Sequence, residues 1–436
     1  MKSIISFIKE SLIELSIYIQ KIEKEYGIDD PVIVYGFCDG LNLVHKIAES
    51  LYEYLIAKTI NFHTLKKYIL SIRNKYDEVI IIGLLSAAYS SESKRLINKI
   101  TDNISLGIII PAYREQERMY DYSKNNPNGQ NAFLNKIMQY YWIFSDNSLI
   151  KSELLFIDDA DITKSGDELI KNYNDIKKKL ILKNNMSIKI IRLLDFKDGN
   201  LKKVNNILEK LKERSFSTKK GGSILFGLNY FLDLNYDYVS YYDFDLTHPI
   251  EHIGLMLNII RKTSTIGMVI NSRRRKNSYG YLPPKGQNLT SSLFQMVNRE
   301  MLNINITDIN VGCKLLSLEA FSKYYNEADD FDLSFDSELV MLCKKYNYSI
   351  IEIGGCFYHK YEDGKQGVMR NYGDMLDNTY KNLLRHNIET NDSNFVLYSI
   401  IKNSQGFAYI VDSFERNRRI NENNEKLILR LKKESV

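Results

Sequence analysis

Two acidic residues, Asp243 and Asp245, stand one position apart directly after an apolar run in the segment VSYYDFDLTHP, residues 239–249. Side chains alternate along an extended strand, so these two carboxylates point to the same side. Neighbouring carboxylates repel each other, and a divalent cation removes that cost. Mg²⁺ and Mn²⁺ prefer hard oxygen ligands and commonly join protein carboxylates to the phosphates of a substrate. The pair therefore predicts a metal site that holds a diphosphate.

Apolar runs that end in polar clusters recur from residue 105 onwards. They are SLGIIIPAYREQER, ELLFIDDADIT, MSIKIIRLLD and YDYVSYYDFD, and segments with helical spacing separate most of them. This alternation favours a mostly parallel sheet that helices cover on both faces. Such sheets place their ligands beyond the carboxyl ends of the strands. Asp158, Asp159 and Asp161 follow the second run, so a second group of acids is expected at the same edge.

The segment TKKGGSILFGLNY, residues 218–230, carries Lys219 and Lys220 before Gly221 and Gly222. It opens a helical stretch, where backbone N–H groups and a lysine could face an anion. A flexible turn with solvated lysines is the alternative interpretation. The segment lacks the spacing of a P-loop and of a dinucleotide fingerprint, which counts against an ATPase and against an NAD-dependent enzyme.

Composition narrows the class of protein. A chain of 436 residues exceeds the usual size of one hydrophobic core. The net charge of +5 is small against 59 basic and 54 acidic residues, which argues against a dedicated nucleic-acid binder. The four cysteines are widely scattered and indicate reduced thiols of a cytosolic protein. No window reaches the roughly 18 apolar residues of a transmembrane helix, so we expect a cytoplasmic protein, with contact at a membrane surface as an alternative.

Residues 1–104 precede the first run of the predicted sheet. The opening 27 residues have the spacing of an amphipathic helix. PVIVYGFCDG and DEVIIIGLLS, residues 31–40 and 77–86, are predicted as strands that helices follow. We expect residues 1–104 to form an accessory region, either α/β or helical, that presents or recognises an acceptor. Residues 105–385 would form the catalytic domain and residues 386–436 a helical tail.

The order of the motifs resembles glycosyltransferase family 2. GIIIPAYRE, LLFIDDAD, KKGGSILFGLNY and DYVSYYDFDLTHP follow one another as in that family, particularly in its dolichyl- and polyprenyl-phosphate glucosyl- and mannosyltransferase branch. NSRRRKNSYGY, TDINVGCKLLS and SFDSELVML continue the pattern. The resemblance covers residues 105–385 and implies a GT-A fold, a Rossmann-like α/β architecture with a mostly parallel central sheet.

The resemblance also implies roles for individual residues. The donor site would consist of Pro111, Ala112, Tyr113, Glu115, Asp158, Asp159, Lys220, Gly221, Asp243 and Arg273. The metal ligands would be Asp243, Asp245 and His359. The acceptor or its phosphate would meet Arg275, Asp336 and Lys365. Asp308 and Asp245 would be the catalytic residues, Asp308 either as the general base or as a group that positions the acceptor.

The implied reaction is a metal-dependent transfer from a nucleotide sugar to a hydroxyl or phosphate, with inversion at the sugar. Mn²⁺ or Mg²⁺ would stabilise the departing diphosphate. A UDP-sugar is favoured as donor over a GDP-sugar, and the acceptor is either soluble or a lipid phosphate. Two alternatives stay open, a non-catalytic module that binds sugar nucleotides and a sugar nucleotidylyltransferase.

Overall fold

A computed structural model describes residues 3–159, 165–178, 180–214, 216, 218, 220–280, 285–358 and 365–388. Side chains are described for these residues except 165, 285–290 and 365–371. The predicted metal ligand His359 and residues 389–436 of the predicted tail lie outside the described residues, and so does Asp161.

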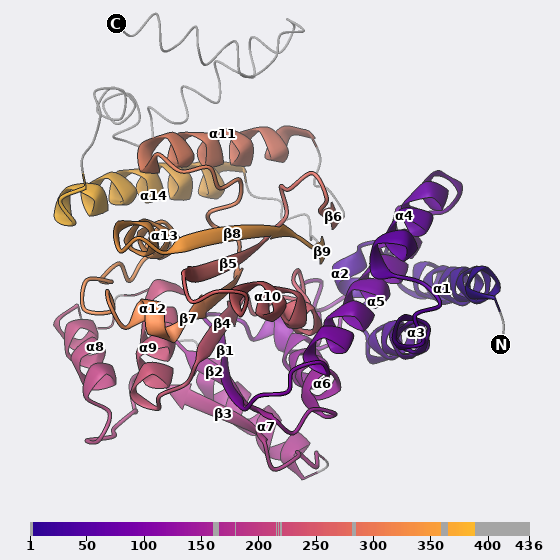
Figure 1. Ribbon diagram of the computed structural model, residues 1–436, viewed down its shortest axis with the longest axis horizontal. Coiled ribbons are helices and arrows are strands. Elements are labelled where there is room, and N and C mark those ends of the chain that lie inside the picture. The colour runs from indigo at the N-terminus through magenta and orange to yellow at the C-terminus, as the bar shows by residue number, and fades with distance from the viewer. Residues whose placement is uncertain are drawn as a thin grey trace, which may run out of the picture.

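A seven-stranded sheet with the order β3-β2-β1-β4-β7-β5-β8 forms the centre of the molecule (Figure 1). Neighbouring strands are parallel except for β7, which runs antiparallel to both β4 and β5. The expected α/β class with a mostly parallel sheet is confirmed. The strands are β1 (Ile104–Ala112), β2 (Ile150–Asp158), β3 (Met186–Arg192), β4 (Tyr238–Tyr242), β5 (Ile266–Ser272), β7 (Cys313–Ser317) and β8 (Ser349–Gly354), and a separate pair consists of β6 (Tyr279–Gly280) and β9 (Cys356–Phe357).

The four apolar runs of the sequence are strands β1 to β4, as predicted. β1 pairs with β2 so that Ala112 lies opposite Asp158, and β2 pairs with β3 so that Asp158 lies opposite Arg192. β4 lies on the other side of β1 in the same direction. The carboxyl ends of these strands therefore meet at one edge of the sheet.

Helices connect and cover the strands. From residue 117 onwards they are η2 (Glu117–Met119), α6 (Ala132–Phe144), α7 (Ser165–Lys177), α8 (Lys202–Glu213), α9 (Lys220–Asp233), η3 (Ile250–His252), α10 (Ile253–Ile260), α11 (Lys285–Leu302), α12 (Leu318–Phe321), α13 (Phe335–Lys345) and α14 (Lys365–Arg385). α9 packs against β1, β2 and β4, whereas α10 packs against β5 and β7. None of the helices in the described part of the chain combines the length and the apolar character that a membrane crossing requires.

The chain before β1 contains only helices among its described residues, which makes the two strand predictions there wrong. The helices are α1 (Ile4–Tyr26), α2 (Pro31–Val34), α3 (Cys38–Ile56), α4 (Phe62–Ile72), η1 (Arg73–Lys75) and α5 (Glu78–Ile97), and they gather beside the sheet in Figure 1. The amphipathic helix predicted at the start is α1, whose Gly27 ends it with φ of 71°. Of the two forms expected for residues 1–104, the helical one agrees with residues 3–103, which precede β1.

α5 explains why the strand prediction failed. α1, α3, α4, α6 and α10 all pack against it, and most of its 20 residues are buried. A helix that is surrounded on every side has no polar stripe, so its apolar run cannot be told from a buried strand by periodicity. The hydrophobic side chains of this helical region and of the sheet belong to one continuous core.

The contact between α5 and α10 depends on a glycine. A Cβ atom on Gly254 would lie 2.3 Å from the backbone oxygen of Ser93, and the Gly254 N–H donates to Ser93 Oγ at 2.8 Å. The two helix backbones can approach each other this closely only where one of them carries no side chain.

Gly254→Ala is expected to destabilise the folded protein by about 1–3 kcal/mol, because the added methyl group must push α5 and α10 apart. Urea denaturation measures the change. Gly199→Ala is the matched control, since Gly199 is exposed and a Cβ there meets nothing within 4 Å. Equal stability of the two variants would show that α5 does not hold α10 in this way.

Candidate active site

Asp243 and Asp245 begin the loop after β4, at the predicted edge of the sheet. The Asp243 N–H donates to the backbone oxygen of Gly312 at 3.0 Å. A Cβ atom on Gly312 would come within 1.9 Å of Asp243 Oδ2, so the missing side chain leaves room for the carboxylate. Asp245 Oδ1 accepts the Thr247 N–H at 3.0 Å, which fixes the turn that follows. The two acids are thus held by separate contacts, one from the residue before β7 and one local.

Lys220, the first residue of α9, forms an ion pair with Asp243. Burial opposes ionisation of Asp243, but Lys220, with smaller contributions from His248 and Arg273, holds its pKa below the usual range for an aspartate. The structure thus brings together the side chains of two predicted donor residues. An ammonium group beside this carboxylate is suited to meet a phosphate oxygen.

Gly221, one of the predicted donor residues, packs against a neighbouring segment of the chain. A Cβ atom there would lie 2.5 Å from the backbone oxygen of Asp332, so the residue allows the segment 330–332 to pack against the start of α9. The next N–H, of Gly222, donates to the Phe331 oxygen at 3.2 Å and to Thr218 Oγ1 at 3.0 Å. This part of the helix terminus is occupied by the protein itself, which favours a packing role for Gly221 over a contact with a donor.

Asp308 is completely buried and is bound by Arg273. Arg273 donates to it from Nε, from Nη2 and from its backbone N–H, each at 2.9 Å. Burial raises the cost of the charge, yet Arg273 and then Arg274 keep the pKa of Asp308 below its ordinary range. The Asp308 N–H in turn donates to Glu352 Oε1 at 2.9 Å. Both oxygens of Asp308 are engaged, which favours a role in positioning Arg273 over the predicted role as general base.

Asp336 lies in a buried pair with Lys314, away from solvent. Asp336 is 3 % exposed, and its Oδ1 accepts from Lys314 Nζ and from the hydroxyl of Tyr241. Burial lowers the pKa of Lys314, and Asp336 opposes that shift. This position favours a structural role for Asp336 over the contact with an acceptor that the sequence predicted.

The chain after β1 supplies Glu115. Arg118 Nη1 donates to both of its oxygens, at 3.0 and 2.7 Å. Burial raises the pKa of Glu115 to about 7 against the opposing effect of Arg118, and the charges of Asp245 and Asp243 raise it further. Glu115 therefore belongs to the electrostatic neighbourhood of the two acids after β4.

The remaining predicted donor residues lie along the same edge. Pro111 and Ala112 are buried at the end of β1, whereas Tyr113 is 38 % exposed. The Asp159 N–H donates to the Ala112 oxygen at 3.1 Å. Asp158 and Asp159 are both buried.

For two of the predicted acceptor residues, Arg275 and Lys365, the structure gives only a place in the fold. Arg275 is exposed in the loop after β5. Lys365 begins α14, and its side chain lies outside the described part.

Two residues that the sequence prediction did not select, Lys136 and His248, also lie near the acids after β4. Lys136 of α6 is completely buried, and its Nζ donates to the backbone oxygen of His248 at 3.0 Å. Burial lowers the pKa of Lys136 to about 8, and the charges of Asp245 and Asp243 oppose that shift.

Burial and then Arg273 lower the pKa of the His248 imidazole, which lies against Phe357. The sequence did not indicate Lys136, because a single lysine in a helical segment is typical of a solvent-facing position. His248 could have been selected from the sequence, since it lies three residues after Asp245.

The carboxylates after β4 fit a divalent cation that a substrate helps to hold. Within the described ranges, no group of three or more His, Cys, Asp or Glu side chains could form a metal cage by itself. Mg²⁺ and Mn²⁺ are commonly bound by one or two carboxylates together with substrate phosphates, and they do not need such a cage. The raised pKa of Glu115 reflects, in part, the negative charge that Asp243 and Asp245 place here, and a cation would relieve it.

Solved structures that are similar to this chain share little sequence identity with it. No family model matches the sequence, and no curated protein matches it. Among solved structures, glucosyl-3-phosphoglycerate synthase from Mycobacterium tuberculosis with Mn²⁺, UDP and glucosyl-3-phosphoglycerate is 13% identical, with a TM-score of 0.42 over 69% of this chain and 85% of that one. A mannosyltransferase from Pyrobaculum calidifontis with GDP-Man and Mn²⁺ is 12% identical, with a TM-score of 0.41 over 84% and 90%. Similarity at this level does not assign the chain to a family.

The raised pKa of Glu115 predicts a pH-dependent stability. The folded protein binds this proton more tightly than the unfolded chain does, so stability falls as the pH rises from about 4.5 towards about 7. Glu115→Gln removes that cost. The stability of the variant relative to the wild type is therefore expected to be greater at pH 8 than at pH 5, by up to about 3 kcal/mol. Urea denaturation at both pH values measures the difference. The exposed neighbour provides the control variant Glu117→Gln, and an identical pH response of the two variants would contradict the assignment.

Proposed function

We propose that this protein is a metal-dependent glycosyltransferase that moves a sugar from a nucleotide-sugar donor, with a UDP-sugar favoured, to an acceptor hydroxyl or phosphate. The observation that carries the proposal is the arrangement of charge after β4. There Asp243 is paired with Lys220 and lies within the electrostatic reach of Arg273. Recognition of a metal-bound diphosphate requires carboxylates for the cation and positively charged side chains for the phosphate oxygens. Asp243 and Asp245 are the carboxylates, and Lys220 and Arg273 are the positively charged side chains.

Each of these residues has a task in the proposed reaction. Asp243 and Asp245 would hold Mn²⁺ or Mg²⁺, which supplies positive charge to the departing diphosphate. Lys220 would contact a phosphate oxygen of the donor. Arg273 would stabilise the negative charge that grows on the leaving group, and Asp308 fixes its guanidinium before the donor arrives.

The acceptor decides whether a general base is needed. A phosphate acceptor is already ionised and needs none, which agrees with an Asp308 whose two oxygens are occupied by Arg273. A hydroxyl acceptor would have to lose its proton to another group. A soluble acceptor and a lipid phosphate both remain within the proposal, and inversion at the sugar stays a prediction.

Two other functions use the same edge of the sheet. A non-catalytic module would bind the nucleotide sugar without turning it over, so metal-dependent hydrolysis of the donor separates it from an enzyme. A sugar nucleotidylyltransferase should carry a Gly-rich loop after its first strand, and the segment PAYREQER, residues 111–118, has no glycine. The transferase is therefore the function that we favour.

A thermal-shift panel of UDP-, GDP-, ADP- and TDP-sugars, with and without Mn²⁺, tests the proposal. One nucleotide class is expected to stabilise the protein only with Mn²⁺, by about 2.7 kcal/mol at a hundred times its dissociation constant. Asp245→Asn is expected to abolish the shift, because it removes a charged ligand of the metal. The exposed Asp175→Asn is the control of equal charge and is expected to behave as the wild type. Absence of any shift in a folded protein, or an equal shift in Asp245→Asn, would refute the metal-bound donor.

Gly312→Ala tests the position of Asp243 without changing any charge. Its Cβ would meet Asp243 Oδ2 at 1.9 Å and force the carboxylate away from Lys220. The apparent affinity for the nucleotide sugar in the presence of Mn²⁺ is expected to fall at least tenfold, which corresponds to about 1.4 kcal/mol of binding free energy. Gly199→Ala controls for the substitution itself, and an unaltered affinity in Gly312→Ala would show that Asp243 does not hold the metal.

A further inference from the structure

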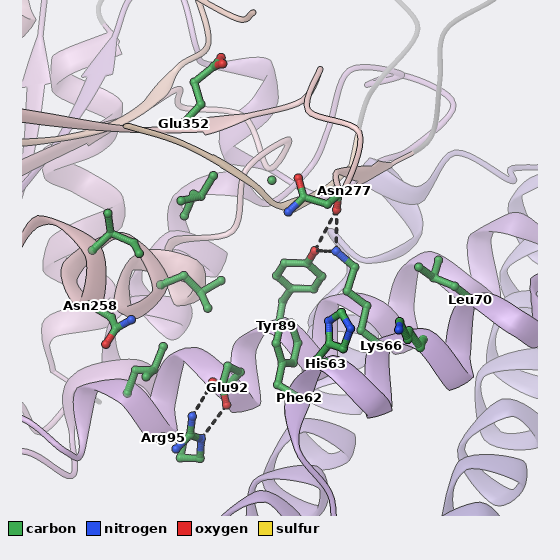
Figure 2. A pocket seen from close by; sticks show the side chains of 16 residues that line it. Phe62, His63, Lys66, Leu70, Tyr89, Glu92, Arg95, Asn258, Asn277 and Glu352 are labelled. Atoms are coloured by element: carbon green, nitrogen blue, oxygen red, sulfur yellow. Dashed lines mark hydrogen bonds and ion pairs between the residues drawn. The ribbon is translucent and has the colours of Figure 1, made fainter. Parts of the chain in front are cut away.

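A groove of about 670 Å³ lies outside the candidate active site, between α4, α5, α10 and the end of β8 (Figure 2). Its volume is within the range of about 300–1,000 Å³ that is usual for small-molecule sites. The helical region before β1 supplies one side of the groove, and the sheet region supplies the other.

Apolar side chains line much of the groove. They are Phe62, Leu70, Leu96, Leu255, Ile259 and Ile353. Leu255 and Ile259 come from α10 and are only partly buried by the rest of the core. An apolar chain placed against them would lose contact with water, which is favourable in proportion to the area covered.

Basic side chains gather at the α4 side. His63, Lys66 and Lys67 follow one another along this helix, and all of them line the groove. The ammonium group of Lys66 donates to the hydroxyl of Tyr89 and to the backbone oxygen of Asn277, the latter at 2.5 Å, as Figure 2 shows. Both acceptors are neutral, and burial lowers the pKa of Lys66. Within the part of the chain that is described, no carboxylate forms an ion pair with these three side chains.

The acids of the groove have other partners. Glu92 accepts from Arg95 Nε at 2.6 Å and from Arg95 Nη2 at 2.5 Å. Glu352 directs its carboxylate away from Lys66 in Figure 2 and accepts the N–H groups of Thr307 at 2.8 Å and Asp308 at 2.9 Å. The positive charge on α4 is therefore left for a ligand to balance.

We propose that this groove binds an amphiphilic anion, an apolar chain that carries a phosphate or a carboxylate. The anionic group would lie at Lys66 and Lys67, and the chain would lie along Leu255 and Ile259. A compact ammonium group suits such anions as a point charge, and the apolar walls select ligands that carry a chain. The proposal stands apart from the proposed sugar transfer, because none of its ligand contacts involves the loop after β4.

Isothermal titration calorimetry with octyl phosphate and octanoate, below their micellar concentrations, tests the site. One or both are expected to bind saturably in a ratio of one to one, and the tighter of the two identifies the preferred head group. Inorganic phosphate, which lacks a chain, and octyl glucoside, which lacks a charge, are expected to bind at least tenfold more weakly. Equal binding of either of these compounds, or no binding of the two anions, would overturn the proposal.

Variants show where the ligand binds. Lys66→Met and Leu255→Trp are each expected to weaken binding at least tenfold, the first by removing the charge and the second by filling the groove. Lys24→Met removes an exposed lysine of α1 and is expected to change nothing. Circular dichroism establishes folding, and Lys67→Met replaces Lys66→Met if that variant does not fold. Unchanged affinity in the groove variants would place the ligand elsewhere.

Competition separates this groove from the candidate active site. An excess of UDP with Mn²⁺ is expected to leave the affinity for octyl phosphate unchanged within twofold. Displacement of octyl phosphate by UDP would mean that it occupies the site after β4, and the proposal would fail even if the protein transfers sugars.

Discussion

The close approach of Gly312 to Asp243 determines how the edge of the sheet is built. β7 runs antiparallel between β4 and β5, so the segment before β7 returns to the carboxyl end of β4. The missing side chain at Gly312 lets the backbone of that segment touch the Asp243 carboxylate. The same segment carries Asp308, whose carboxylate holds Arg273 from the end of β5. One reversed strand thus joins the ends of β4 and β5 in one site.

Burial of charge is the second constraint on this edge. Burial raises the pKa of Glu115 to about 7 and lowers that of Lys136 to about 8, so both groups are close to losing their charge in the folded protein. Asp243 and Asp308 stay ionised because Lys220 and Arg273 lie against them. A divalent cation and a diphosphate bring opposite charges together, so they could enter such a site as a pair without leaving a buried charge uncompensated.

The helices before β1 are part of the same hydrophobic core as the sheet. α5 is buried by helices from both regions, and Gly254 permits its contact with α10. The groove along α4 is a consequence of this packing, since its walls come from both regions. Glu352 lines the groove and accepts the N–H of Asp308, so one side chain connects the groove with the candidate active site.

The sequence by itself determined the four parallel strands and the edge at which they end, because from residue 105 onwards apolar runs that end in polar clusters alternate with segments of helical spacing. It also suggested Asp243, Lys220, Asp308 and Arg273 as site residues, because their types are visible without a structure, and their roles stay predictions. Tertiary structure decided what local patterns could not encode. The buried helix α5 has the same apolar run as a strand, and the partners of a side chain depend on chain segments far apart in sequence. Lys136 is buried within reach of the charges of Asp243 and Asp245, and Asp336 is paired inside the core, because packing between distant elements sets burial and pairing.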